Sequence, residues 1–186
     1  MIRKSGGPPD QAPAWHLALF VLETWNKINF EIYVDSGISF VQDNQSVSNK
    51  GVLRGLHFQN PPFAQGKLVR VLRGSVLDVA VDIRKKSKTY GQHFSIKLSE
   101  ENSAMFWIPP GFAHGFITLE NDTIFTYKCT EVYDKESEEA LIWNDKDLVI
   151  VWPSPDPILS EKDSNCLLYT SPSPRDRTRW RIPSSA

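Results

Sequence analysis

The sequence predicts an all-β protein, built as a small sandwich or barrel. Between residues 51 and 130, short stretches in which apolar and polar residues alternate follow one another, as they do in half-buried strands. Glycine, proline and small polar residues separate these stretches. The pattern of a long amphipathic helix does not occur in the sequence. Short strands at this spacing are typical of sandwiches and barrels.

Before residue 51 the expected elements are short. The apolar stretch 17–25 indicates a strand, whereas 26–32 fits either a helix or a strand. A short strand is expected over 39–44, ending at the turn-forming pair Asp43-Asn44. Any helix is therefore short and peripheral to the strands.

From residue 67 onward the strands follow in succession. Alternation predicts four of them, over 67–73, 76–83, 93–98 and 123–130. In the stretch 76–83 the apolar residues at odd-numbered positions share one face, and Asp78 and Asp82 share the other. An extended stretch is expected at 149–153, followed by a short helical turn that begins at Ser160.

Length and composition are those of one soluble domain. The chain has 186 residues and a formal net charge of −1, so its charge does not favour nucleic acid or an anionic membrane as a partner. We expect a domain over 17–165, a disordered or non-native extension over 1–16 and a disordered, non-native tail over 166–186. The longest apolar run near the start is too short to span a membrane, and two cysteines make no disulfide framework. We therefore expect a cytoplasmic protein.

The stretch 51–59 (GVLRGLHFQ) places an arginine and a histidine close together in one expected strand. Strict alternation would put His57 on the same face as Leu53 and Gly55, and Arg54 on the opposite face. A histidine that shares a face with small and apolar residues can serve as a base inside a barrel. The other interpretation is a half-buried histidine that is hydrogen-bonded to the backbone.

Residues 108–116 (IPPGFAHGF) contain a second histidine, after a Pro-x-Gly turn that opens a strand. This pattern is similar to the second motif of the cupin superfamily, small β-barrels that often hold a metal. Zinc and iron sites need three or four ligands, whereas His57 and His114 supply two and have no carboxylate at the usual short spacing. We therefore expect no metal here.

A histidine that is not a metal ligand can act as a base. A base that removes a proton from carbon needs a pKa near neutrality, and the resulting carbanion needs a cation or a donor at the oxygen where charge collects. His57 can be the base, Lys67 the cation and Tyr127 a proton donor. Residue type alone does not distinguish these three from other polar residues of the chain.

Six motifs occur in order between about residues 20 and 165. They are QDN at 42–44, GVLRGLH at 51–57, QGK at 65–67, VAVD at 79–82, WIPPGFAHG at 107–115 and LSEKD at 159–163. Together, and at this spacing, they closely resemble the dTDP-4-dehydrorhamnose 3,5-epimerase family. The resemblance implies a double-stranded β-helix, the jelly roll of the cupins, that forms a homodimer and uses neither a metal nor a cofactor.

The resemblance also implies the substrate and the chemistry. The substrate would be dTDP-4-keto-6-deoxy-D-glucose, on the route to dTDP-L-rhamnose. Its 4-keto group acidifies the hydrogens at C3 and C5, so that one base can invert both centres through enolate intermediates.

By position in the family's motifs, His57 would be the base and Asp163 would orient it. Lys67 would stabilise the enolate oxygen, and Tyr127 would return a proton from the opposite face of the sugar. Substrate-binding positions are implied for Glu23, Gln42, Asn44, Arg54, Lys67, His114, Glu138 and Lys162.

Each of these residues also has a structural interpretation. Tyr127 alternates with apolar neighbours and can simply fill the barrel. Lys67 and Arg54 can be solvated strand ends, and the residues at 162–163 can be an ordinary surface pair. Glu138 lies in an acidic run, which is usually a solvated face.

The chain departs from the family at one position. The resemblance implies an arginine that reaches the diphosphate of the substrate, and the ungapped position holds Ala18. Loss of one charge-assisted contact should weaken binding by about 1.5–3 kcal/mol. Ala18→Arg is therefore expected to lower KM roughly tenfold to a hundredfold. An unchanged KM in a steady-state assay would contradict this account.

Three other functions are compatible with the sequence. A related epimerase of another deoxysugar pathway would invert C3 or C5 alone, and the product's stereochemistry would show it. A catalytically impaired cupin would bind the nucleotide sugar without exchanging its C3 and C5 hydrogens with solvent deuterium. A metal-dependent oxygenase would retain stoichiometric iron or zinc after purification.

Overall fold

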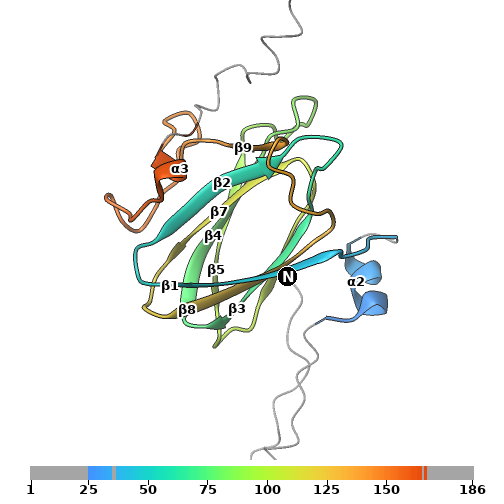
Figure 1. Ribbon diagram of the computed structural model, residues 1–186, viewed down its shortest axis with the longest axis horizontal. Coiled ribbons are helices and arrows are strands. Elements are labelled where there is room, and N and C mark those ends of the chain that lie inside the picture. Colours follow the sequence, from blue (N-terminus) through green and yellow to red (C-terminus); the bar gives the residue numbers. More distant parts are fainter. Residues whose placement is uncertain (1–24, 35–36, 165, 167–186) are drawn as a thin grey trace, which may run out of the picture.

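The computed structural model describes residues 25–34, 37–164 and 166. Its strands form two antiparallel sheets that face each other (Figure 1). One sheet has the strand order β1-β8-β3-β6 and the other the order β5-β4-β7-β2-β9. The expected all-β fold, a double-stranded β-helix with short peripheral helices, is confirmed. No helix in the described part of the chain has the length and apolar character that crossing a membrane requires.

The four-stranded sheet consists of β1 (Gln42–Ser48), β3 (Lys67–Arg73), β6 (Met105–Ile108) and β8 (Thr123–Cys129). The five-stranded sheet consists of β2 (Leu53–Gln59), β4 (Ser75–Asp82), β5 (His93–Ser99), β7 (Phe112–Thr118) and β9 (Glu138–Ala140). The four strands predicted by alternation after residue 66 are all present, each within one residue at either end. In the described part of the chain, two short helices lie at opposite sides, α2 (Lys27–Tyr33) near the start of β1 and α3 (Glu161–Ser164) beside β2 (Figure 1).

The ambiguous stretch 26–32 belongs to a helix, α2. Asn26 caps it, because the side-chain oxygen of Asn26 accepts hydrogen bonds from two backbone N–H groups of the first turn. Phe30 is buried and packs edge-on against Trp107, which fixes the helix to the four-stranded sheet. The strand expected over 17–25, except for Trp25, falls outside the described residues, as do the extension 1–16 and nearly all of the tail.

The prediction of a turn at Asp43-Asn44 is wrong, because β1 includes both residues. Asp43 lies opposite Lys128 of β8, and Asn44 lies opposite Tyr127, in a continuous antiparallel ladder. The backbone hydrogen bonds of this ladder override the local turn preference of the pair. Asn44 and Tyr127 therefore share one face of the sheet.

Apolar side chains form two cores. The core between the sheets contains Val69, Val71, Val76, Ala80, Leu98, Ala104, Ile108, Phe116 and Phe125. A second core, formed with the C-terminal segment, contains Leu56, Val79, Val81, Ala113, Leu141 and Leu148. The alternation expected in β4 is confirmed, because its odd-numbered apolar residues pack in the second core and Asp78 contacts His114 between the sheets. Ile150 and Trp152 of the extended stretch pack against the second core.

β2 contains a bulge that redirects its side chains. The register between β2 and β7 shifts between Arg54 and His57. Arg54 lies opposite Phe116 and His57 lies opposite His114, two β7 residues that are two positions apart and share the interior face. The expectation that Arg54 and His57 lie on opposite faces is therefore wrong. Leu56, between them, packs in the second core.

The same bulge leaves no room for a side chain at Gly55. Its φ is +126°, and a Cβ atom there would lie 2.4 Å from Cα of Gly115 and 2.8 Å from the carbonyl oxygen of His114. Both atoms belong to the backbone of β7, so the two strands would have to separate. Gly55→Ala is therefore expected to lower the free energy of unfolding by about 3 kcal/mol or more.

The control for this prediction is Gly51→Ala. The φ of Gly51 is also positive, at +84°, but a Cβ atom there would meet nothing within 4 Å. Gly51→Ala should therefore cost only the backbone strain, about 1 kcal/mol. Denaturant unfolding of both variants makes the comparison, and equal losses would show that the close approach at Gly55 is unimportant.

Candidate active site

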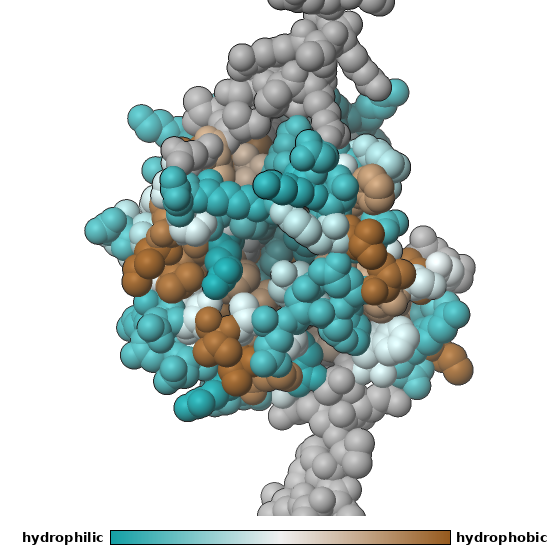
Figure 2. Space-filling model, viewed as in Figure 1, coloured by the Kyte–Doolittle hydropathy of each residue, from teal (hydrophilic) through white to brown (hydrophobic). Residues whose placement is uncertain are grey.

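A polar cavity of about 320 Å³ lies between β1, β3 and β8 of one sheet and β2 and β9 of the other. Six expected site residues line it, namely Gln42, Asn44, His57, Lys67, Tyr127 and Glu138. Five further residues complete the lining, namely Phe58, Gln59, Gln65, Cys129 and Tyr133. On the face shown in Figure 2, hydrophilic residues gather around the middle, whereas hydrophobic residues form separate patches nearer the edge.

His57 is bound to a carboxylate from the C-terminal end of the fold. Its Nε2 atom lies 2.6 Å from Oδ1 of Asp163, which is 2% exposed. Burial by itself would raise the pKa of Asp163, but hydrogen bonds from His57 and Ser160 outweigh it and hold the pKa below its ordinary value. An ionised carboxylate can only accept hydrogen bonds, so Nε2 of His57 carries a proton. Its Nδ1 atom therefore holds the lone pair that a base needs.

Lys67 reaches the cavity from the first position of β3, opposite Cys129 of β8. Burial lowers the pKa of the Lys67 ammonium, while the nearby Cys129, Glu138 and Asp78 act in the opposite direction. Lys67 is half-buried, and a cation that is partly removed from water interacts more strongly with negative charge that develops beside it. Lys67 is therefore not a solvated strand end.

Tyr127 combines packing with a place at the cavity. Its ring contacts Phe125, with 6.0 Å between the ring centroids, and the residue also lines the cavity. Burial raises the pKa of the Tyr127 phenol, which keeps the hydroxyl protonated at neutral pH. The residue therefore helps to fill the barrel and presents a proton that can be donated.

Glu138 does not belong to a solvated acidic face. Only 14% of its side chain is exposed, and its carboxylate pairs with the ammonium of Lys162 and accepts a 2.7 Å hydrogen bond from the hydroxyl of Tyr133. Burial acts to raise the pKa of Glu138, but the hydrogen bonds from Lys162 and Tyr133 outweigh it and lower the pKa. The same hydrogen bond raises the pKa of Tyr133 to about 12. Lys162 and Asp163 thus bind different partners and are not a surface pair.

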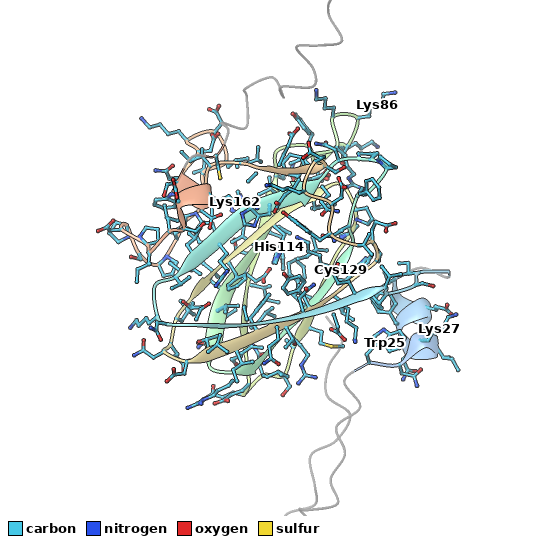
Figure 3. The ribbon with its side chains drawn as sticks, viewed as in Figure 1. Trp25, Lys27, Lys86, His114, Cys129 and Lys162 are labelled. Atoms are coloured by element: carbon cyan, nitrogen blue, oxygen red, sulfur yellow. The ribbon has the colours of Figure 1, made fainter. Side chains whose placement is uncertain are left out.

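Four expected site residues, namely Arg54, His114, Lys162 and Asp163, do not line the cavity themselves. Lys162 and Asp163 each contact a residue that does, Glu138 and His57. Arg54 is exposed to solvent, and its Nη2 atom lies 3.4 Å from the hydroxyl of Ser48 in β1. His114 lies between the sheets (Figure 3), with Nε2 3.0–3.1 Å from the two carboxylate oxygens of Asp78. Glu23 and Ala18 fall outside the described residues.

The two interior histidines sit opposite each other, and each contacts its own carboxylate. His57 lies across from His114, but the first binds Asp163 and the second binds Asp78. Among the residues that the structure describes, no three or more His, Cys, Asp and Glu side chains are grouped to hold a metal ion. The arrangement provides one basic nitrogen, a cation and a hydroxyl around a single cavity.

Sequence reasoning did not identify the five further lining residues, nor the carboxylate that binds His114. Tyr133 lies in the loop between β8 and β9, where no pattern marks it. Cys129 was expected in the core, and it is buried, but it also lines the cavity. Alternation placed Asp78 on the face opposite the apolar residues of its strand, but no pattern indicated that it contacts His114.

Comparisons with known proteins agree on one family. The family model for dTDP-4-dehydrorhamnose 3,5-epimerase matches residues 19–170. The dTDP-4-dehydrorhamnose 3,5-epimerase of Shigella flexneri is 51% identical over 146 residues, which are 78% of this chain and 81% of that relative.

Two solved structures share the fold. The dTDP-6-deoxy-D-glucose-3,5-epimerase of Legionella pneumophila Philadelphia 1, in complex with dTDP-4-keto-L-rhamnose, is 48% identical with a TM-score of 0.77, covering 80% of this chain and 79% of that one. The dTDP-4-dehydrorhamnose 3,5-epimerase of Bacillus anthracis, with TDP and PPi bound, is 42% identical with a TM-score of 0.81, covering 89% and 91%.

Proposed function

The chain belongs to the dTDP-4-dehydrorhamnose 3,5-epimerase family, and we propose that it inverts C3 and C5 of dTDP-4-keto-6-deoxy-D-glucose. It is an isomerase, on the route to dTDP-L-rhamnose. The observation that supports this activity best is the cavity in which a carboxylate-bound His57 meets Lys67 and Tyr127. The bound dTDP-4-keto-L-rhamnose of the Legionella relative is the product expected of this reaction.

The reaction begins with proton abstraction beside the ketone. Nδ1 of His57 takes the proton from C3 or C5, and the electron pair of the C–H bond moves onto the 4-keto oxygen, giving an enolate. The ammonium of Lys67 stabilises that oxygen. Asp163 stabilises the imidazolium that forms, as a carboxylate does for a histidine base.

Inversion requires a proton from the other side of the sugar. The hydroxyl of Tyr127 gives its proton to the same carbon from the opposite face, and the ketone forms again. His57 then releases its proton to solvent and Tyr127 takes one up, which restores both groups. The steps repeat at the second carbon, because both carbons are next to the ketone. Each round forms a new C–H bond for the one that was broken, so the substrate is neither oxidised nor reduced.

The remaining polar residues are proposed to hold the nucleotide sugar. The side-chain amides of Gln42 and Asn44, 2.9 Å apart, line the cavity and suit the hydroxyls of a sugar. Arg54 and Lys162 are cations suited to the diphosphate. Contacts to the substrate are also proposed for Glu23, His114 and Glu138.

The test is incubation of the protein with dTDP-4-keto-6-deoxy-D-glucose in deuterated water. Deuterium at both C3 and C5, with inverted product, is the expected result. Label at one carbon alone would show a mono-epimerase, and no label with measurable binding would show a nucleotide-sugar-binding protein. Loss of activity on metal removal, with recovery on adding iron or zinc, would show a metal-dependent enzyme.

The protonation of Lys67 predicts how activity depends on pH. Because burial lowers the pKa of Lys67 below its ordinary value, the ammonium is lost at a lower pH than in an exposed lysine. A neutral amine cannot balance the charge on the enolate oxygen, so we expect kcat to fall as pH rises through the lowered pKa. Burial raises the pKa of Tyr127, so its proton is lost at a higher pH than in an exposed tyrosine.

The control for the pH dependence is Lys67→Arg, whose guanidinium keeps its proton at all these pH values. The kcat of Lys67→Arg should be lower than that of the unaltered protein, but it should not decline over the pH interval in which the kcat of the unaltered protein falls. A kcat of the unaltered protein that stays constant to about pH 10.4, the ordinary lysine pKa, would contradict the prediction.

We also propose that the enzyme is a homodimer in the cytoplasm. A cavity of about 390 Å³ is lined partly by apolar residues of the four-stranded sheet and by Trp25. A second copy of the chain would cover these apolar residues. Cys129 and Cys166 are free thiols, as is usual in a reducing compartment. Sedimentation equilibrium tests the dimer, and fractionation of cells tests the location.

A further inference from the structure

The segment that leads to Asp163 runs alongside β2. The backbone N–H of Leu53 donates to the carbonyl of Ile158 at 2.9 Å, and the N–H of Ile158 donates to the carbonyl of Gly51 at 2.8 Å. α3 begins shortly after this pairing. Asp163 is thereby placed beside the strand that carries His57.

The two carboxylate oxygens of Asp163 have different partners. Oδ1 contacts Nε2 of His57 at 2.6 Å and accepts a hydrogen bond from the backbone N–H of Gly55 at 3.3 Å. Oδ2 lies 2.7 Å from the hydroxyl of Ser160. Because an ionised carboxylate has no proton to give, the Ser160 hydroxyl must be the donor.

The hydroxyl of Ser160 also has a second contact. Its Oγ atom accepts a hydrogen bond from the backbone N–H of Asp163 at 3.1 Å, the contact of a residue that caps a helical turn. Capping requires only an acceptor. The hydrogen bond that Ser160 donates to Oδ2 is therefore not needed for the cap. It is made to the same carboxylate that binds the base, His57.

We propose that Ser160 is a positioning residue that fixes the rotation of the Asp163 carboxylate and so aligns Oδ1 with the imidazole of His57. This inference rests on the proposed function. The last torsion of an aspartate side chain has no sharp minimum, so the carboxylate plane is held by its hydrogen bonds. With Oδ2 held by Ser160, Oδ1 stays in line with the N–H of His57. Ser160 does not touch the substrate and acts through Asp163.

Four variants separate donation from capping. Ser160→Ala removes both functions of the hydroxyl, and Ser160→Thr keeps both. Ser160→Asp keeps an acceptor for the cap but has no proton to donate to Oδ2. Ser164→Ala is the matched control, because the Ser164 hydroxyl lies in the same helix and donates to the carbonyl of Ser160.

Two measurements read out these variants. Steady-state turnover of dTDP-4-keto-6-deoxy-D-glucose should show kcat lowered about tenfold to a hundredfold in Ser160→Ala and Ser160→Asp, with KM changed by less than about twofold. Ser160→Thr should recover most of the activity, and Ser164→Ala should match the unaltered protein. In the ligand-free protein, the NMR signal of the His57 Nε2–H proton should weaken or shift only in the two variants that cannot donate.

The outcomes distinguish this inference from the proposed function. The role of Ser160 would be overturned if Ser160→Ala and Ser164→Ala had equal kcat. It would also be overturned if Ser160→Ala raised KM and left kcat unchanged, or if Ser160→Thr did not recover activity. If Ser160→Ala unfolds, the Asp and Thr variants, which keep the cap, decide the question. If the unaltered protein exchanges no deuterium into the substrate, the proposed function fails, and the His57 signal still tests whether Ser160 aligns the pair.

Discussion

His57→Ala is expected to slow epimerisation by about 10²–10⁴-fold, the contribution usual for a positioned general base. Deuterium exchange should be lost at C3 and at C5 together, because one Nδ1 atom serves both carbons in the proposed reaction. The variant should still fold and bind the nucleotide sugar, since His57 is partly exposed and lines a cavity rather than filling the core. Exchange followed by mass spectrometry and NMR measures the effect at each carbon.

The control for His57 is His93→Ala. His93 begins β5, opposite Val81, and does not line the cavity. This variant should keep full exchange at both carbons. If His57→Ala loses exchange at one carbon and retains it at the other, a second base serves the retained position, and the assignment of both steps to His57 is wrong.

Lys67→Met is expected to lower kcat by about 10²–10³-fold, as loss of a group that stabilises an oxyanion does. The free energy of unfolding should be unchanged or higher, because burial disfavours the charged ammonium and methionine fills a similar volume without a charge. Activity should therefore fall without a loss of stability. Steady-state kinetics and denaturant unfolding of the same preparation measure both.

The control for Lys67 is Lys128→Met, on the neighbouring strand β8. Lys128 pairs with Asp43 on the surface, with about a third of its side chain exposed, and it does not line this cavity. Its removal should leave kcat nearly unchanged, because exposed ion pairs contribute little. A loss of kcat as large as that of Lys67→Met would show that overall charge, and not a cation at the ketone, determines the rate.

Most of the strands could be predicted because their periodicity is local. In β4, alternation alone placed the apolar side chains on one face and Asp78 on the other, and the structure agrees. The helix at 26–32 stayed undecided because its apolar residues fit both periods. The turn at Asp43-Asn44 was predicted wrongly because pairing with β8, which lies more than 80 positions away, decides its conformation.

Only part of the site could be predicted from the sequence. The motifs contain His57 and Lys67, the family's spacing added Tyr127, and the structure brings all three to one cavity. Periodicity could not show that Arg54 and His57 face the same way, because a bulge adds one residue to the strand and breaks the alternation. The contacts of Glu138 could not be predicted either, since an acidic run does not indicate that one of its members pairs with Lys162.

The distance in sequence between His57 and its carboxylate gives the order in which the enzyme becomes competent during synthesis. Asp163 follows His57 by 106 positions and comes after every strand of both sheets. In the proposed reaction, a chain that ends after β9 would therefore hold an imidazole without its carboxylate. It would also lack Leu141, Leu148, Ile150 and Trp152, which pack in the second core. Loss of the C-terminal segment is thus expected to weaken the packing of the five-stranded sheet as well as to stop turnover.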